Sequence, residues 1–376
     1  MGDALRVLVA PDSFKGTLTA AEAAAAMAAG VVDALPDADV VQLPFADGGE
    51  GTVDAVIASG AQARVDRVGG PLGDLVEARW ALSGETAVVE MAAASGLGLV
   101  DPTPATALAA DTRGTGELVR RAVAAGARRV VLGIGGSATT DGGIGALRAL
   151  GVRLLDADGS EVVGGGGALA RIRSVDAGAA RAALEGVELV LCSDVANPFA
   201  GQRGAAAVFA PQKGADAAGV AALDAGLRSW AAVLDATFGS DLAAAGWGGS
   251  GGGIAGGLQV ALGARAADGV ELIAELLGLD AAIATSDLVI VAEGSLDAQS
   301  LLGKAPVGIA RHAAALGVPC VAVAGRVAVD RHALADAGID DAVAAVDVAP
   351  SVDAALAEPA RWVRAATAVL VGRRAG

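Results

Sequence analysis

Short apolar runs alternate with segments of helical pattern at both ends of the chain. The first run, residues 5–10, is followed by a capping box formed by Thr19 and Glu22, which opens an Ala-rich helix. Toward the other end, an apolar run at 287–291, a helical pattern at 307–316 and a second apolar run at 318–324 follow one another. Short strands joined by helical crossovers pair in parallel, so these segments predict a parallel α/β sheet.

The middle of the chain has a different pattern, which indicates a second domain. Residues 63–91 contain apolar runs separated by turn residues, as antiparallel hairpins do. A helical pattern at 117–125 and a strand pattern at 129–132 come next. The pattern changes near residue 62 and resumes near 287, which predicts two α/β domains. The first is a parallel-sheet domain built from residues 1–62 and 287–376, and the second is an inserted mixed α/β domain of residues 63–286.

Composition and charge narrow the class of protein. The 376 residues carry a formal net charge of -16 without a basic stripe, so nucleic acid is not expected as a partner. The uncharged stretch 242–264 is long enough to span a membrane, but its glycine-rich centre makes a poor helix, so no membrane is expected. The chain opens on a strand pattern without a signal peptide, and Cys192 and Cys320 lie in apolar runs, as buried thiols do. We therefore expect a cytoplasmic protein.

Lysine is rare in this chain and always stands beside glycine. Lys15, Lys213 and Lys304 are the three lysines among 27 basic residues, and the rest are arginine. Where arginine has replaced lysine so widely, the lysines that remain mark places that need a compact ammonium rather than a planar guanidinium. Chance survival on the surface is the alternative explanation. The single asparagine, Asn197, is a candidate functional residue for the same reason.

Glycine-rich loops indicate phosphate chemistry. They lie at 11–16, 47–51, 133–143, 201–214, 246–257 and 294–303, and several run directly into helical patterns. Glycine lets successive amide groups converge on an anion, and a helix N-terminus favours negative charge. Three aspartates in or beside these loops, Asp47, Asp194 and Asp297, can hold Mg²⁺ or accept a hydroxyl proton. We favour Asp194 as the base and Asp297 as the metal ligand, although a single loop aspartate is more often a helix cap or turn former.

One loop also fits a dehydrogenase. The strand at 130–132 leads into the loop from Gly133 to Ala138, which matches the G-x-G-x-x-A dinucleotide pattern, and Asp156 and Asp158 follow at the required distance. An NAD(P)-dependent dehydrogenase is therefore the alternative function. The loop continues as a long polar segment to Gly143, which does not suit the tight turn of that motif. A non-catalytic ligand-binding protein is a third class, which would need none of the aspartates.

Six motifs, taken together and in order, resemble those of the bacterial type-1 glycerate kinases. They are APDSFKG at 10–16, PFADGGEGT at 44–52, GIGGSATTDGGIG at 133–145, DVANP at 194–198, FAPQKGA at 209–215, and DAQS at 297–300 followed by Gly303 and Lys304. They cover nearly the whole chain. The chain departs from the family pattern at Ala196, Ala292 and Ser295, where we expect Thr, Thr and a basic residue.

The resemblance implies a fold and a reaction. The fold is a flavodoxin-like domain made from both chain ends and an inserted domain of restriction-endonuclease-like shape. The reaction is transfer of the ATP γ-phosphate to D-glycerate, with Mg²⁺, and 2-phosphoglycerate is favoured over 3-phosphoglycerate as the product. The expected partners are these small-molecule substrates, and the oligomeric state stays open.

The candidate site residues follow from the loops and the resemblance together. The expected catalytic residues are Asp194, Asp297 and Lys304, with Asp297 and Asp194 as Mg²⁺ ligands. The expected substrate- or phosphate-binding residues are Asp12, Ser13, Lys15, Asp47, Gly48, Gly49, Ser137, Asn197, Lys213 and Arg326.

Overall fold

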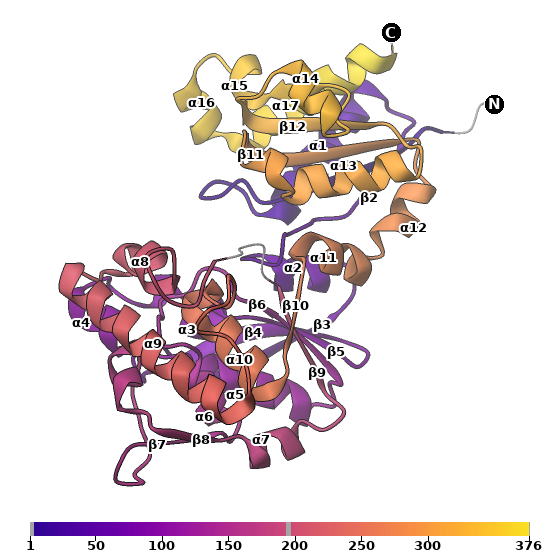
Figure 1. Ribbon diagram of the computed structural model, residues 1–376. Coiled ribbons are helices and arrows are strands. Elements are labelled where there is room, and N and C mark those ends of the chain that lie inside the picture. The colour runs from indigo at the N-terminus through magenta and orange to yellow at the C-terminus, as the bar shows by residue number, and fades with distance from the viewer. Residues whose placement is uncertain (1–3, 193–196, 376) are drawn as a thin grey trace. The chain divides into compact units, whose positions relative to one another are not determined.

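The computed structural model describes residues 4–192 and 197–375, which form two compact units (Figure 1). The first unit contains the described residues up to Asp47, then Asp54–Gly60, and all described residues from Val270 onward. The second unit contains Gly48–Val53 and the described part of Ala61–Gly269. The sequence predicts domain boundaries at 62/63 and 286/287, and these boundaries remain a prediction.

A five-stranded parallel sheet forms the centre of the first unit. Its strands run in the order β13-β12-β11-β1-β2, and every neighbouring pair is parallel. When the five strands are numbered in chain order within the unit, their order in the sheet is 2-1-3-4-5. The chain therefore adds β2 on one side of β1 and adds β11, β12 and β13 on the other side. The strands are β1 Arg6–Pro11, β2 Asp39–Gln42, β11 Leu288–Leu296, β12 Cys320–Val327 and β13 Ala342–Ala344.

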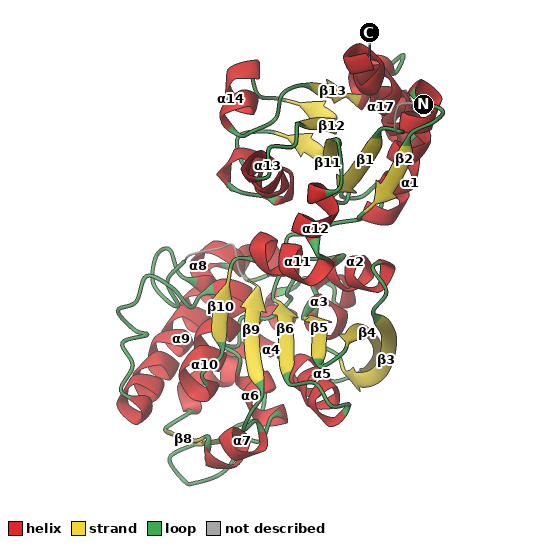
Figure 2. Ribbon diagram, turned by 90° about the vertical axis from the view of Figure 1, so that its right-hand side faces the viewer, coloured by secondary structure: helices red, strands yellow, loops and turns green. Residues whose placement is uncertain are grey.

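Helices cover both faces of this sheet (Figure 2). On one face, α1 and α17 bury Met27, Val31 and Leu370 against the apolar side chains of β1, β11 and β12. The predicted capping box is present at the start of α1, since Thr19 and Glu22 exchange side-chain to backbone hydrogen bonds. The helices of the unit are α1 Ala20–Ala34, α2 Thr52–Ala58, α11 Gly269–Leu277, α12 Leu279–Ala284, α13 Ala305–Ala315, α14 Arg331–Asp336, α15 Ala345–Val348, α16 Val352–Ala357 and α17 Pro359–Ala375, with a 3₁₀ turn η5 at Ser300–Leu302; α2 and α11 begin at the border with the second unit.

A six-stranded mixed sheet organises the second unit. Its order is β10-β9-β6-β5-β4-β3, and the predicted hairpin pattern at 63–91 forms the antiparallel strands β3, β4 and β5. The remaining neighbours pair in parallel. The strands are β3 Gln62–Gly69, β4 Leu75–Ser83, β5 Thr86–Glu90, β6 Arg129–Gly133, β9 Glu188–Cys192 and β10 Arg265–Ala267, and a separate pair joins β7 Arg153–Leu155 to β8 Ser174–Asp176.

Helices surround this second sheet and supply much of its core. Trp230 and Leu227 of α9 and Ile144 of α6 are fully buried. The helices are α3 Ala92–Ser95, α4 Pro104–Ala109, α5 Arg113–Ala124, α6 Ile144–Ala149, α7 Gly178–Ala183, α8 Ala205–Phe209, α9 Ala217–Phe238 and α10 Ile254–Leu262; the 3₁₀ helices are η1 Leu97–Leu99, η2 Gly166–Arg171, η3 Pro211–Lys213 and η4 Ser250–Gly253.

Helix α9 is, by length and composition alone, apolar enough to cross a membrane, and it is the one such helix among the described residues. Its Leu223, Leu227 and Trp230 are fully buried in the core of the second unit, and a core helix meets the same criterion. The uncharged stretch at 242–264, whose glycine-rich centre argued against a span, folds as the 3₁₀ helix η4 followed by the nine-residue α10.

Candidate active site

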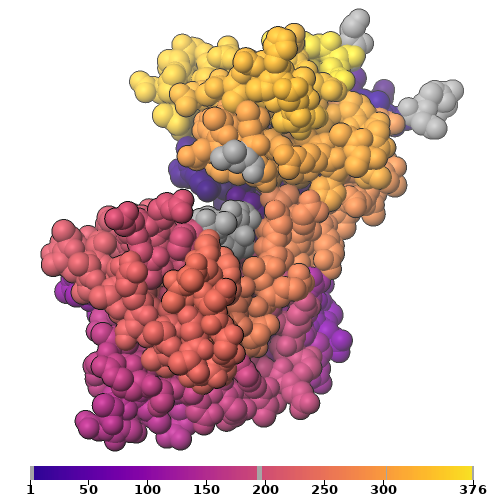
Figure 3. All heavy atoms as spheres, in the orientation of Figure 1, coloured from indigo at the N-terminus to yellow at the C-terminus, as the bar shows by residue number. Residues whose placement is uncertain are grey.

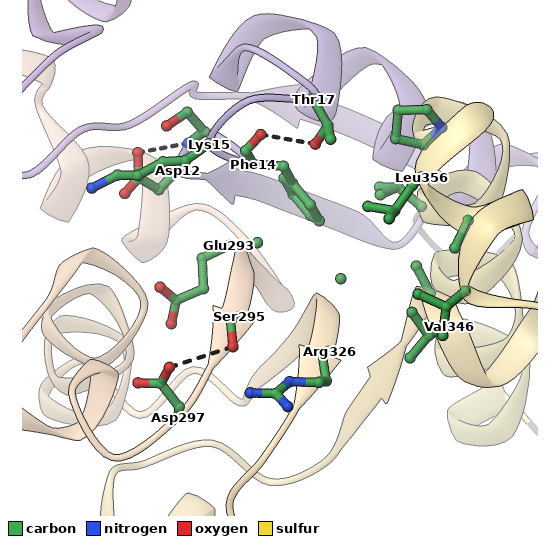
Figure 4. Close-up of a pocket in the computed structure, with 18 of the residues that line it drawn as sticks. Asp12, Phe14, Lys15, Thr17, Glu293, Ser295, Asp297, Arg326, Val346 and Leu356 are labelled. Carbon is green, nitrogen blue, oxygen red and sulfur yellow. Dashed lines mark hydrogen bonds between the residues drawn. The ribbon is translucent and has the colours of Figure 1, made fainter.

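A cavity of about 470 Å³ lies in the first unit at the carboxyl ends of β1, β11 and β12 (Figure 4). Lys15 follows β1, Ser295 belongs to the end of β11, and Arg326 belongs to the end of β12. The sheet grows in opposite directions from β1 and β11, and open parallel sheets bind ligands beside such a point, beyond the carboxyl ends of their strands. The position of the cavity therefore follows from the strand order.

The loop after β1 is held against the end of β11. The Asp12 amide donates a hydrogen bond to the Ala292 carbonyl (2.8 Å), and Phe14 is buried and paired with Leu18. These contacts hold the residues on either side of Lys15, which is exposed and lines the cavity.

The ends of β11 and β12 approach each other closely beside that loop. A Cβ atom placed on Gly325 would lie 2.4 Å from the carbonyl oxygen of Gly294, so only glycine fits at position 325. The two strands pair Ser295 directly with Arg326. This pairing places the Arg326 guanidinium beside the Asp297 loop, on the same wall of the cavity (Figure 4).

Two buried carboxyl groups lie at the polar end of the cavity. Burial and the neighbouring Asp47 raise the pKa of Asp12 to about 7, although the Ser13 amide donates to Asp12 Oδ1 at 2.6 Å. Burial also raises the pKa of Glu293, while a hydrogen bond from Ser300 and the charge of Lys304 oppose the shift. The Oε1 atom of Glu293 has no hydrogen-bond partner among the described residues. A buried carboxylate oxygen without a partner is costly, so this end of the cavity suits a ligand that completes it.

Asp297 differs from these two groups because its loop stabilises its charge. Its Oδ1 accepts the Gln299 amide (2.9 Å), and its backbone amide donates to Ser300 Oγ (3.1 Å). The Gln299 hydrogen bond is the main reason why the pKa of Asp297 is lowered. Lys304, the residue before α13, lines the same cavity. The two predicted catalytic residues that the structure describes, Asp297 and Lys304, thus lie in one cavity.

The structure brings together some of the predicted site residues and places others in the second unit. Asp194 lies outside the described residues. Glu293 was not predicted, and its signal in the sequence was a carboxylate at the end of a buried strand pattern. The cavity of the first unit contains Asp12, Ser13, Lys15, Asp47, Asp297, Lys304 and Arg326, whereas Gly48, Gly49, Ser137, Asn197 and Lys213 belong to the second unit.

Lys213 is buried in the second unit with its ammonium turned toward a loop. Its Nζ donates to Ser137 Oγ (2.8 Å) and to the Thr139 carbonyl (2.6 Å), and only 3 % of the residue is exposed. Burial lowers the pKa of Lys213 to about 7, and the charge of Asp141 opposes this shift. Lys213 therefore holds the loop after β6 by direct contact.

Asp141 fixes the other end of the same loop, and sequence reasoning did not single it out. Fully buried, it accepts hydrogen bonds from Thr112 Oγ1 (2.8 Å), the Thr112 amide (2.9 Å) and the amides of Gly143 and Gly145 (3.0 and 3.1 Å). Burial raises the pKa of Asp141, and these bonds act against the shift. Thr112, the residue before α5, thus binds Asp141 through both its amide and its hydroxyl.

The remaining predicted residues of the second unit lie near the ends of its parallel strands. A Cβ on Gly133, the last residue of β6, would lie 2.4 Å from the Gly48 carbonyl, so the Gly48–Gly49 turn packs on that strand end. Asn197 is buried, donates to the Pro198 carbonyl and leaves its Oδ1 without a partner among the described residues.

The donor set of the cavity fits Mg²⁺. Within 4–192 and 197–375 no group of three or more His, Cys, Asp or Glu side chains is arranged to hold a metal. Mg²⁺ is usually bound by one or two carboxylates together with substrate phosphates and waters rather than by an all-protein cage. Asp297, whose charge is stabilised, and Glu293, with its partnerless oxygen, are oxygen donors of the kind this ion prefers.

Comparison with known proteins identifies the family. A family model described as the glycerate kinase family matches residues 7–373. The chain belongs to the glycerate kinase family. Two relatives are the Bacillus subtilis protein named glycerate kinase, 42% identical, and the Escherichia coli protein named glycerate 2-kinase, 41% identical, each aligned over 89% of both chains. The crystal structure of a putative glycerate kinase 2 from Salmonella typhimurium LT2 matches with a TM-score of 0.86 at 37% identity, covering 99% of each chain.

Membership of the glycerate kinase family makes this protein a kinase that transfers phosphate to an alcohol. The comparisons do not support the dehydrogenase alternative. Strand β6 ends at Gly133, and helix α6 begins only at Ile144. The loop between them lacks the immediate strand-turn-helix passage that places a pyrophosphate on a helix N-terminus. The match of this chain to G-x-G-x-x-A therefore reflects a glycine-rich loop and not a dinucleotide site.

Proposed function

We propose that the protein transfers the γ-phosphate of ATP to D-glycerate, and that the 2-hydroxyl is the acceptor. The observation that carries this proposal is the cavity of the first unit, where Lys15, Lys304 and Arg326 share one space with the charged Asp297. Phosphoryl transfer depends on positioning and on neutralising negative charge, which these residue types provide. The relatives named glycerate kinase and glycerate 2-kinase support the acceptor and its position.

Each side chain has a role that its chemistry allows. Lys304 neutralises charge on the transferred phosphate as a compact ammonium. Arg326 receives the carboxylate of glycerate, since it is a cation on the cavity wall. Asp194 stays our candidate for the base that accepts the hydroxyl proton, on the sequence motif alone.

Bound Mg²⁺ would neutralise part of the phosphate charge. Asp297 and Glu293 would hold it in this cavity, and Asp194 stays a predicted ligand. Asp297 keeps its negative charge because its loop amides bind the ionised form. It is therefore ready to accept a cation without first losing a proton.

The finer description of the fold belongs to the same proposal. The strand order of the first unit supports a flavodoxin-like domain, since 2-1-3-4-5 is that fold's order. For the second unit we propose the restriction-endonuclease-like shape that the family resemblance implies. We also propose a cytoplasmic enzyme whose partners are its small-molecule substrates.

The test is to incubate purified protein with ATP, Mg²⁺ and D-glycerate and to measure ADP. We expect ADP release that requires both the metal and glycerate. Phosphorus NMR of the product assigns the position, because a phosphate on the secondary carbon couples to one proton and gives a doublet, whereas one on the primary carbon gives a triplet. Metal-independent turnover, or reduction of NAD in place of ADP release, would contradict the proposal, and a triplet would move the phosphate to the 3-position.

A further inference from the structure

The cavity of the first unit has two chemically different walls. Its polar wall carries Asp297 and Arg326, and Figure 4 shows Val346 and Leu356 on the opposite side. The apolar wall comes from α15, α16 and the start of α17, which follow β13 in the chain. A ligand that fills this space must therefore be polar at one end and apolar at the other.

The apolar wall includes large side chains that the protein itself leaves uncovered. Val352 is 58% exposed and Leu356 is 59% exposed, although both belong to the cavity lining. The C-terminal helices that carry them lie at the surface of the unit (Figure 3). Exposed apolar side chains gathered at the mouth of a cavity are a mark of a binding site, because a ligand gains free energy by covering them.

Glycerate cannot be the ligand of this wall. Every one of its carbons bears an oxygen, so it has no apolar surface to place against Leu356. A purine nucleotide has both parts, since its base is flat and weakly polar and its phosphates are anionic. The volume of about 470 Å³ lies within the usual range for small-molecule sites.

We propose that this cavity is the nucleotide site, with the purine base against the α15–α17 wall and the phosphates at the Lys15 and Lys304 end. This inference rests on the proposed kinase function and assigns ATP, one of the two substrates, to the cavity of the first unit. The polar end fits such a ligand through Mg²⁺, because the buried Oε1 of Glu293 has no partner among the described residues and would accept the cation that accompanies the phosphates. The base contacts side chains of α15–α17, and the phosphates contact the loops after β1 and β11.

The test compares two identical substitutions at exposed leucines of the same unit. Leu356→Gln removes apolar contact from the cavity wall, and Leu316→Gln is the control, because Leu316 is 44% exposed and lies outside the cavity. Calorimetric titration with ADP in the presence of Mg²⁺ should show the Kd rising about fivefold in Leu356→Gln and staying unchanged in the control. Binding of inorganic tripolyphosphate, which has no base, should be equal in both variants and the wild type.

Two results would overturn the assignment. One is an unchanged Kd for ADP in Leu356→Gln, which would show that the base does not contact this wall. The other is a parallel loss of ADP and tripolyphosphate binding at unchanged melting temperature, which would mean that Leu356 shapes the phosphate end instead. Failure of the proposed function is distinguishable: wild-type protein that binds ADP with this Leu356 dependence but leaves glycerate unphosphorylated would refute the acceptor and retain the nucleotide site.

Discussion

Replacing Lys213 with methionine should change how the stability of the protein depends on pH. In the wild type, the Lys213 ammonium donates to Ser137 Oγ and the Thr139 carbonyl in a site that excludes water. Lys213→Met keeps the length of the side chain and removes both donors. The loss of a partner for a buried carbonyl costs about 1–3 kcal/mol, whereas removal of the desolvated ammonium offsets this cost near neutral pH, so the pH dependence is the diagnostic quantity.

The pKa of Lys213 gives this pH dependence its sign and size. Burial lowers that pKa from the usual 10.5 to about 7. Between these two values the unfolded chain holds a proton that the folded chain does not, so wild-type stability rises with pH by about 1.4 kcal/mol per unit. Below pH 7 both states are protonated and the desolvation penalty is fully present. The unfolding free energy of the wild type minus that of Lys213→Met should therefore rise by on the order of 2–3 kcal/mol from pH 6 to pH 9.

Urea unfolding of both proteins at several pH values measures this effect. Trp230 fluorescence is a suitable probe, because its indole is buried and donates to the Gly142 carbonyl in the same loop. Titrating groups other than Asp141, whose charge acts on Lys213, are common to both proteins and cancel in the difference. Ser137→Ala is the control, since it removes one acceptor but keeps the ammonium and should follow the wild-type pH dependence. A difference in unfolding free energy that is the same at pH 6 and pH 9 would refute the account of a desolvated lysine.

Three further predictions concern the site. Burial raises the pKa of Asp12 to about 7, so the folded chain keeps a proton that the unfolded chain releases above about pH 4, and stability falls from there to pH 7. Asp12→Asn should therefore raise the melting temperature at pH 8 but not at pH 4, and equal changes at both values would contradict the role of burial. Lys304→Ala should lower turnover at least about tenfold, roughly 1.4 kcal/mol, at an unchanged melting temperature, whereas near-normal turnover would make Lys304 a surface residue. Asp194→Asn should lower turnover by roughly 10²-fold or more, and a variant that keeps its rate but loses stability would identify a turn-forming aspartate.

The elements of the first unit could be predicted because their signals are local. The apolar run at 5–10 and the Thr19–Glu22 capping box are β1 and the start of α1. The strand predicted at 287–291 continues to Leu296 in the structure, and the one predicted to end at Ala324 continues to Val327. These extensions carry polar residues, including Ser295 and Arg326, which line the cavity instead of the core. Periodicity follows burial, so it cannot report a strand end that faces a ligand.

The burial and partners of individual site residues could not be predicted from the sequence, because they depend on contacts between distant parts of the chain. Glu293 lies beyond the strand predicted at 287–291, and its partnerless oxygen depends on how β1 and β12 pack around it. Asp141 lies within a sequence motif, but two of its four hydrogen bonds come from Thr112, which is 29 residues away in the chain. The other two come from the amides of Gly143 and Gly145. Such contacts join residues far apart in the chain, and no local pattern encodes them.

The retained lysines show how one sequence signal can have two physical causes. At position 213 the ammonium is enclosed and meets two oxygen acceptors, and a guanidinium brought there would bury more donors than the described partners satisfy. Lys15 is exposed and Lys304 only half-buried, and both face a cavity with room for a larger head group. Enclosure therefore cannot explain why these two residues are lysine. A mobile point charge that can follow a phosphate during transfer explains them better, and this reasoning predicts that Lys304→Arg loses activity while remaining folded.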